Sequence, residues 1–373
     1  MSVAPLSGTR VLEFSGQGPV PFCGMMLADL GASVIRIDPL ASSDRVRSRN
    51  TVLDRGRRSI TLDLKEESGR ARAMQLVKQS DVLLEGYRPG VMERLGLGPD
   101  DCHGTHDRLV YARLTGWGQD GPMAQAAGHD INYIAVTGIL GAIGREEPTP
   151  PLNIIGDYAG GGSLAAFGVL AALLRDAKGA RRQIVDSAMT EGSLYLLSYQ
   201  YALLARGDWN DERRSNLVDG GHPLFDTYAC KDGQYVAVGA VEQKFADTLF
   251  DAIGLPHLVG VDVQDTAQFA VLRSSLSDRF SERTRDQWVE ATETVLDSCL
   301  SPVLSLREAE HHDQISHRGA LRTRDGVLEP VPSPRFESSW ALPTPAPTPG
   351  QHTEDLLDEL GERSRPKVSE RDV

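Results

Sequence analysis

Residues 9–38 read TRVLEFSGQGPVPFCGMMLADLGASVIRID, and their order of apolar segments indicates the fold class. Two short apolar runs, 9–14 and 33–38, have the composition of buried strands. Between them, residues 23–30 form an apolar helix that Gly31 is expected to end. A strand, a helix and a second strand in this order form a β-α-β unit, which predicts a parallel sheet with helical crossovers. The sequence therefore predicts an α/β protein with a Rossmann-like sheet.

The same pattern continues along the chain, with further strands expected at 59–64, 81–85, 109–114 and 183–188. Residues 1–205 are thus predicted to form a large domain. Residues 206–224 are polar and are predicted to be a linker. A β-hairpin and helices within 225–310 predict a smaller α/β domain. Of the remaining residues, 311–373, the Pro-rich part from 330 to 349 indicates an extended strap, followed by a short helix.

The composition narrows the function classes. A net charge of -13 argues against nucleic acid as the main partner. The four cysteines are scattered without a C-x-x-C pair, which favours a reducing compartment and argues against a structural zinc. No apolar run approaches 18 residues, and no targeting segment is apparent at either end, so no membrane partner is expected. These features predict a cytoplasmic enzyme or binding protein without a metal.

Two local patterns suggest a nucleotide or phosphate ligand. Gly16-Gln17-Gly18, with an acidic Asp38 after the next strand, resembles a dinucleotide-binding fingerprint. Pro21 stands where the third glycine belongs, so a tight first turn is favoured over NAD binding. The second pattern is a basic run within residues 44–58, with arginine at positions 45, 47, 49, 55, 57 and 58.

That run is either an ion-paired surface loop or a phosphate site, since guanidinium groups pair with phosphate oxygens. Four more side chains follow successive predicted strands, namely Lys65, Tyr87, Arg88 and Arg94. The carboxyl ends of adjacent parallel strands meet at one edge of a sheet, where α/β proteins bind ligands. This placement favours phosphate binding.

A histidine and an aspartate mark the two ends of an apolar, Gly-rich stretch at 128–162, which begins GHDINY and ends NIIGDYAGGG. Residues 163–174 are apolar nearly all round, which predicts a deeply buried helix. Asp157 precedes that helix, where a carboxylate either caps free N–H groups or marks a site favourable to negative charge. His129 alone is more often structural. Together, His129 and Asp157 are suited to chemistry that forms an oxyanion.

Four stretches jointly resemble the family III CoA transferases, namely PLSGTRVLEFSG, RGRRSITLDLK, EGYRPGVMERLGLGP and LVYARLTGWGQDGP. Three others, GHDINYIAVTG, PLNIIGDYAGGG and YVAVGAVEQKF, are similar to the α-methylacyl-CoA racemase branch of that family. The likeness runs from about residue 5 to residue 361. It implies a Rossmann-like large domain, a smaller α/β domain, a C-terminal strap and helix that return to the large domain, and two chains interlocked as a homodimer.

The resemblance also implies the site residues. The catalytic histidine and aspartate of the racemases match His129 and Asp157, and the glutamate paired with the histidine matches Glu242. Residues that contact CoA or the thioester match Leu62, Asp63, Leu64, Lys65, Gly86, Tyr87, Arg88, Arg94, Gly128, Asp130, Ile131, Asn132 and Tyr133. One departure is Pro39, which stands where the racemases often have arginine, so a CoA contact is lost there or supplied by the basic run.

The implied activity is racemisation of the carbon α to a 2-methylacyl-CoA thioester by 1,1-proton transfer through an enolate. No cofactor is expected, because CoA is part of the acyl-CoA substrate. His129 and Asp157 would flank the carbon, each acting as base in one direction and acid in the other. The alternatives are CoA transfer between carboxylic acids with Asp157 as nucleophile, and a non-catalytic acyl-CoA binder. Met25, Met26 and Met189 line an acyl pocket or belong to the core.

Overall fold

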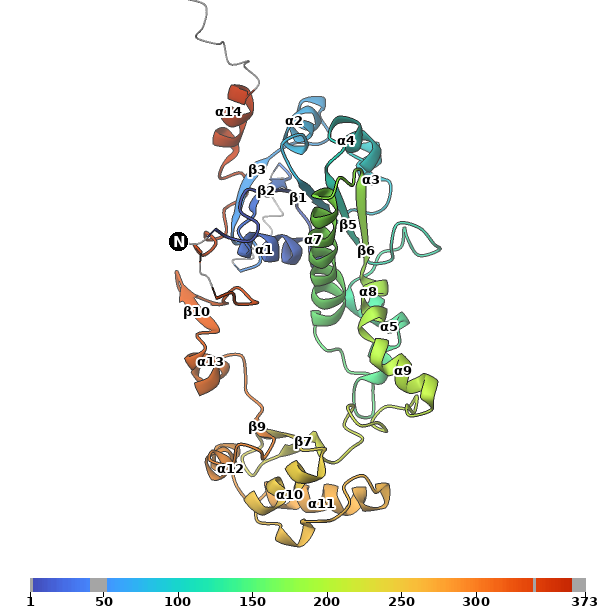
Figure 1. Cartoon of the computed structure of the whole chain (residues 1–373), viewed down its shortest axis with the longest axis vertical. Helices are drawn as coiled ribbons and strands as arrows, with labels where there is room; N and C mark the ends of the chain where they lie inside the picture. The colour runs from blue at the N-terminus through green and yellow to red at the C-terminus, as the bar shows by residue number, and fades with distance from the viewer. Residues whose placement is uncertain (1–2, 41–51, 338–339, 364–373) are drawn as a thin grey trace, which may run out of the picture. The chain divides into compact units, whose positions relative to one another are not determined.

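The computed structural model describes residues 3–40, 52–337 and 340–363. The chain divides into two compact units (Figure 1). The first contains residues 1–137, 152–197 and 322–373, and the second contains 138–151 and 198–321. This division differs from the predicted domains at three places. Residues 138–151 and 198–205, predicted in the large domain, belong to the second unit. The polar residues 206–224, predicted as a linker, and residues 311–321, predicted in the returning strap, belong to it as well.

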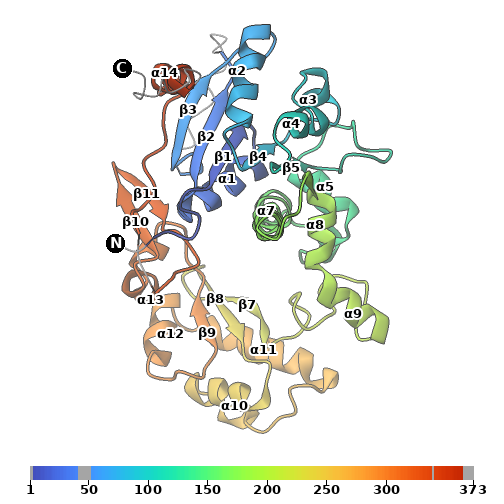
Figure 2. The same cartoon turned by 45° about the horizontal axis from the view of Figure 1, so that its top comes forward.

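The first unit is built on a six-stranded sheet in which every pairing is parallel, as the β-α-β pattern predicts. The strand order is β3-β2-β1-β4-β5-β6, and Figure 2 shows most of this order. The strands are β1 (Arg10–Phe14), β2 (Ser33–Asp38), β3 (Arg57–Thr61), β4 (Val82–Glu85), β5 (Val110–Thr115) and β6 (Gln183–Ala188).

Helices cover both faces of this sheet, which explains why its central strands are apolar on both sides. On one face, α1 (Pro19–Asp29) and α7 (Leu164–Asp176) form a core with Val11, Leu84 and Ala112. On the other, the core around Leu12 and Leu83 includes side chains of α2, α3, α4 and α14. These helices are α2 (Glu67–Val77), α3 (Val91–Arg94), α4 (Pro99–Thr105) and α14 (Thr353–Arg363). The unit also contains α5 (Asp130–Val136), α8 (Met189–Leu196), and the two-stranded sheet of β10 (Leu321–Arg324) and β11 (Val327–Pro330).

The helix α7 corrects one expectation. It continues directly from a π-helix, η1 (Ile154–Ser163), and only part of its surface is buried. Ala165 and Val169 pack against the sheet, whereas the Phe167 and Leu174 side chains are 70% and 69% exposed. The prediction of deep burial on all sides was wrong because only one face meets the sheet. Residues Ile154–Asp176 are long and apolar enough to cross a membrane, a test that core helices of globular domains also pass.

The basic run is largely structural where it is described. Arg55 pairs with Asp29 at 2.5 Å, and Arg57 pairs with Glu13 at 2.9 Å, all four side chains being buried. Guanidinium groups committed to buried carboxylates are not available to phosphate, so the phosphate prediction was wrong for these two arginines. Arg58 pairs with Glu359 of α14. Arg45, Arg47 and Arg49 lie outside the described residues.

The strap contacts the edge of the sheet. The N–H of Gly56 donates to the carbonyl of Thr344 at 2.8 Å, and the N–H of His352 donates to the carbonyl of Ser59 at 2.9 Å. Arg55 also donates to the carbonyl of Pro330 at 2.8 Å. The buried arginine therefore links the sheet to the returning chain.

The second unit is a small α/β structure, as the sequence predicts (Figure 2). Its antiparallel sheet packs on α10, α11 and α12 around Phe250, Phe280 and Trp288. Its strands are β7 (Phe225–Ala229), β8 (Tyr235–Gly239) and β9 (Leu300–Pro302). Its helices are α6 (Ile139–Ala142), α9 (Ser198–Arg206), α10 (Gln243–Ala252), η2 (Pro256–Leu258), η3 (Thr266–Gln268), α11 (Phe269–Phe280), α12 (Arg285–Thr292), η4 (Ala309–His311) and α13 (Asp313–His317).

Candidate active site

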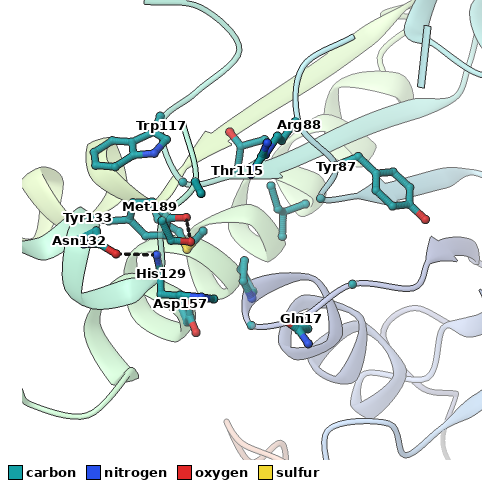
Figure 3. Close-up of a pocket in the computed structure, with 18 of the residues that line it drawn as sticks. Gln17, Tyr87, Arg88, Thr115, Trp117, His129, Asn132, Tyr133, Asp157 and Met189 are labelled. Atoms are coloured by element: carbon teal, nitrogen blue, oxygen red, sulfur yellow. Dashed lines mark hydrogen bonds between the residues drawn. The ribbon is translucent and has the colours of Figure 1, made fainter. Parts of the chain in front are cut away.

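The strand order of the large sheet places the site. The order reverses between β1 and β4, and the crevice at the carboxyl ends of such strands is where open α/β sheets bind ligands. A cavity of about 590 Å³ lies there, here called the switch-point cavity (Figure 3). Its walls come from the loops after β1, β4 and β5, from the segment before α5, and from η1. The first unit alone contributes all its lining residues.

The loop after β1 brings backbone close to Asp157. Gly18 is the N-cap of α1 and has φ +63°, a conformation that glycine adopts without strain. A Cβ atom at this position would lie 2.9 Å from Cγ of Asp157. The Gly16-Gln17-Gly18 sequence therefore forms a tight turn against the carboxylate, and Gln17 also lines the cavity.

His129 is the N-cap of α5 and is exposed to solvent in the cavity wall. Its backbone N–H donates to Oδ1 of Asn132 at 3.0 Å, which fixes the start of the helix. Tyr133 packs edge-on against Trp117, with ring centroids 4.9 Å apart, and its hydroxyl donates to the carbonyl of Gly128 at 2.6 Å. These contacts hold the backbone on both sides of His129 and leave its ring beside Asp157 (Figure 3).

Asp157 lies in the first turn of η1. The helix begins at Ile154, so the expectation that Asp157 caps a helix at residue 163 was wrong. Its backbone N–H donates to Oδ1 of the buried Asp130 at 2.7 Å. Nδ2 of Asn153 donates to its carboxylate oxygen Oδ2 at 2.9 Å. One aspartate therefore fixes the backbone of Asp157, and an asparagine orients its carboxylate.

The surroundings of Asp157 favour its protonated form. Partial burial raises the pKa of this carboxyl above its ordinary value, and the negative charge of Asp130 adds to the rise. The hydrogen bond from Asn153 and the charge of His129 lower the pKa but do not cancel the effect of burial. A carboxyl with a raised pKa is better suited to exchange protons near neutral pH than an ordinary surface aspartate.

The turn after β4 supplies a polar wall. Tyr87 and Arg88 line the cavity, and the N–H of Tyr87 donates to Oε2 of the buried Glu85 at 2.7 Å. Arg113 of β5 donates from Nε to Oε1 of the same Glu85 at 2.8 Å. Arg113 also pairs with Glu93 of α3 at 2.9 Å. The turn that presents Arg88 is thus held by a partly buried ionic network between β4, β5 and α3.

The structure brings together only part of the predicted site. Predicted residues that line the switch-point cavity are Gly86, Tyr87, Arg88, Gly128, His129, Asn132, Tyr133 and Asp157. Predicted residues of the first unit that do not line it are Leu62, Asp63, Leu64, Lys65, Arg94, Asp130 and Ile131. The four from Leu62 to Lys65 follow β3 at the edge of the sheet, two strands from β1. Glu242 is the exposed N-cap of α10 in the second unit, and its pairing with His129 stays a prediction.

Sequence reasoning missed three contributors to the site. Asn153 holds the Asp157 carboxylate, Gly18 makes room for it, and Gln17 faces the cavity.

Of the three methionines predicted to line an acyl pocket or belong to the core, Met189 lines the cavity, whereas Met25 and Met26 lie in α1 outside its lining. In the described part of the chain, no three His, Cys, Asp or Glu side chains are grouped so that they could hold a metal ion.

Comparison with known proteins gives one family. Residues 6–353 match CoA-transferase family III. The chain is 40% identical to the α-methylacyl-CoA racemase of Homo sapiens over 95% of this chain and 93% of the relative. It is 33% identical to the succinyl-CoA–D-citramalate CoA-transferase of Chloroflexus aurantiacus over 68% of this chain and 66% of that relative. A CaiB/BaiF family protein from Brucella suis shares the fold, with a TM-score of 0.83, 23% identity, and coverage of 96% of this chain and 100% of that one.

Proposed function

Because the chain belongs to CoA-transferase family III, we propose that it racemises 2-methyl-branched acyl-CoA thioesters by 1,1-proton transfer through an enolate. The observation that carries this proposal is that His129 and Asp157 line one cavity from two different elements. The 40% identity to a human α-methylacyl-CoA racemase supports the substrate class.

The two groups complement each other chemically. A proton on the carbon α to a thioester is weakly acidic, and inversion requires its removal from one face and return to the other. One group acts as base while the other, on the opposite face, is the acid, and the roles exchange in the reverse direction. General acid–base catalysis of this kind contributes a rate factor of about 10² to 10⁴. The raised pKa of Asp157 suits it to both roles.

The enolate oxygen in the proposed mechanism needs hydrogen-bond donors. The N–H of Asp157 is already bonded to Asp130, and the residues after it lie inside the helix. At the start of α5 the N–H groups of Asn132 and Tyr133 turn back to the carbonyl of His129. The N–H groups of Asp130 and Ile131 precede them in the first turn, where helices have no acceptors of their own. Asp130 and Ile131 lie outside the lining of the switch-point cavity, so the donors to the enolate oxygen must come from groups that line it.

The CoA part of the substrate would follow the polar wall. Arg88 presents a guanidinium at the rim, where it can pair with a phosphate group of CoA. Tyr87 has an aromatic ring on the same turn. As the family resemblance implies, we propose that Glu242 stabilises the imidazolium form of His129. We also propose, on the same ground, that two chains assemble as an interlocked homodimer.

The test is α-proton exchange without an acceptor. Incubation of a single enantiomer of 2-methylacyl-CoA with the protein in D2O should give deuterium at the α-carbon and loss of optical purity when no carboxylic acid is present. A binding protein would give neither. Exchange that appears only with an added acid, together with transfer of CoA to that acid, would contradict the proposal.

CoA transfer remains the second candidate because a CoA-transferase is among the relatives. In that reaction the Asp157 carboxylate attacks the thioester carbonyl carbon, the carbon–sulfur bond breaks, CoA leaves as its thiolate, and the acyl group and Asp157 form a mixed anhydride. His129 is not needed for this step. The His129→Ala variant therefore separates the two functions, since it should abolish racemisation but leave CoA transfer largely intact.

A further inference from the structure

A second cavity lies wholly within the second unit and contains none of the predicted catalytic residues. Its volume is about 700 Å³, within the usual range for small-molecule sites. Three arginines line it, and they come from three separate parts of the chain. Arg145 follows α6, Arg214 lies in the polar segment before β7, and Arg273 is in α11. Their convergence is therefore a product of the fold.

All three guanidinium groups meet at one carboxylate, that of Asp226 in β7. Arg145 Nη2 lies 2.7 Å from Oδ1 of Asp226, and Arg214 Nη2 lies 3.2 Å from Oδ2. Arg273 Nη1 also pairs with Oδ2. The carboxylate is buried, whereas the Arg145 side chain is 50% exposed. Arg214 has φ +58°, an uncommon conformation for a residue with a side chain. The arginines thus lie between a buried anion and the open cavity.

The charges in this cluster do not balance. Three guanidinium groups and one carboxylate leave a net charge of +2 (three positive charges minus one), although the whole chain carries -13. The first unit has a comparable cluster, in which Arg55, Arg322 and Arg324 surround Glu329. There Arg55 has a second carboxylate, and all three arginine side chains are at most 22% exposed. The Glu329 cluster is a structural network, whereas the Asp226 cluster has excess charge facing a cavity.

The cluster also retains hydrogen-bonding capacity. Among the bonds within the described part of the chain, Nε and Nη1 of Arg145, Nη1 of Arg214 and Nε of Arg273 donate none. Tyr235 at the start of β8 lines the same cavity, and 47% of its surface is exposed. An aromatic face beside excess guanidinium charge can hold a flat organic group next to an anion.

We infer that this cavity is a second ligand site, which binds the phosphate monoester group of a small molecule through Arg145, Arg214 and Arg273 and packs its flat ring against Tyr235. A phosphate monoester is close to a dianion at neutral pH, so it balances the charge of +2. Its three terminal oxygens accept several hydrogen bonds, which matches guanidinium donors arriving from different directions.

Calorimetric titration of the full-length protein with phenyl phosphate and with inorganic phosphate tests this site. Both should bind, phenyl phosphate more tightly. Arg145→Gln should weaken both by about ten-fold or more, since it removes one charge-assisted contact. Tyr235→Leu should weaken phenyl phosphate alone. Arg307→Gln, the same change at an exposed arginine of the second unit outside this cavity, is the matched control and should leave both affinities unchanged.

Three results would overturn the inference as a whole, and a fourth would overturn its ring contact with Tyr235. The first is absence of binding to the wild-type protein. The second is binding that Arg88→Gln abolishes and Arg145→Gln leaves intact, which would place the phosphate in the switch-point cavity. The third is equal weakening by Arg145→Gln and Arg307→Gln, which would indicate a general charge effect. Equal affinities for the two probes, unaffected by Tyr235→Leu, would exclude the ring contact. Thermal unfolding of each variant verifies that it is folded.

Discussion

Asp130 acts on Asp157 in two separate ways. Its Oδ1 accepts the backbone N–H of Asp157, and its negative charge raises the pKa of the Asp157 carboxyl, second in this direction only to burial. Its other oxygen, Oδ2, is buried without a hydrogen-bond partner among the described residues. An unpaired carboxylate oxygen in a buried position is costly, which fits a role in tuning its neighbour.

The Asp130→Asn variant should shift the pH profile. Asn keeps an oxygen that accepts the Asp157 N–H but removes the charge, so the pKa of Asp157 falls. In the direction in which Asp157 is the base it must be deprotonated, and kcat/KM rises as the pH rises through its pKa. This rise should therefore move to lower pH in the variant. A rise that stays in place or moves to higher pH would show that Asp130 does not set the basicity of Asp157.

Arg57 should matter for stability. It is the ion-pair partner of Glu13, which is fully buried and whose pKa burial raises. Arg57→Met leaves this carboxylate unpaired and should lower the free energy of unfolding by about 3 to 5 kcal/mol, measured by denaturant titration. The double variant Glu13→Gln/Arg57→Met should recover much of the loss. Equal stabilities of the single variant and the wild type would disprove the role of this pair.

At the scale of elements, η1 depends on close backbone contacts that only glycine allows. A Cβ at Gly192 in α8 would lie 1.9 Å from the carbonyl oxygen of Gly160, and one at Gly161 would lie 2.9 Å from Pro19. The Gly-rich half of η1 is therefore held between α1 and α8. This packing fixes the turn that carries Asp157.

The Gly18→Ala variant should reduce activity more than stability. The added methyl group would lie 2.9 Å from Cγ of Asp157, and the backbone conformation at this position, φ +63° and ψ -111°, adds strain of about 1 to 3 kcal/mol. Displacement of the carboxylate should lower kcat for racemisation at least ten-fold. Gly8→Ala is the control, because it has φ +88° and no atom within 4 Å of the new Cβ. A similar loss of kcat in both variants would mean that strain, rather than the contact with Asp157, is responsible.

The strands of the large sheet were readily predicted from the sequence, whereas the helix η1, which carries Asp157, was not. Residues 33–38 and 183–188 were predicted as strands with the bounds the structure has. For 33–38 the reason is that buried parallel strands are short apolar runs. The start of the helix that carries Asp157 was placed nine residues too late, at 163 instead of Ile154. Three consecutive glycines disfavour a helix locally, and tertiary contacts with α1 and α8 override that preference.

The site was also predicted only in part, because some of its residues act through tertiary contacts that the sequence does not reveal. His129, Asp157 and the Tyr87–Arg88 turn belong to motifs that can be read from the sequence, and the cavity joins them. Asn153 and Gly18 act through contacts with Asp157 that depend on the three-dimensional path of the chain. Phosphate binding was wrongly predicted for Arg55 and Arg57 of the basic run, because charge alone does not distinguish buried ion pairs such as Arg57–Glu13 from a phosphate site.

At the scale of the whole molecule, the described residues of the first unit include an exposed apolar surface on α7 and β6. Phe167 and Leu174 of α7 and Ile184 of β6 are 70%, 69% and 53% exposed. Such surfaces usually mark an interface. Together with the family resemblance, they support the predicted homodimer.

Light scattering after size-exclusion chromatography should therefore give twice the chain mass of 40.5 kDa. Phe167→Glu places a charge on this apolar face and should shift the population towards monomer as the protein is diluted. Lys178→Glu, a charge change just beyond the end of α7, is the control. A wild-type protein that is monomeric at micromolar concentration would contradict the assignment of this surface.

The central claim is that His129 and Asp157 act on opposite faces of one carbon. The direct measurement is α-proton exchange in D2O by Asp157→Asn, with the R and S enantiomers of 2-methylacyl-CoA followed separately by mass spectrometry and chiral analysis. The account predicts that the variant, with His129 intact, still exchanges one enantiomer and inverts neither, while His129→Ala exchanges only the other. Loss of exchange for both enantiomers in one variant, with unchanged racemisation in the other, would contradict it.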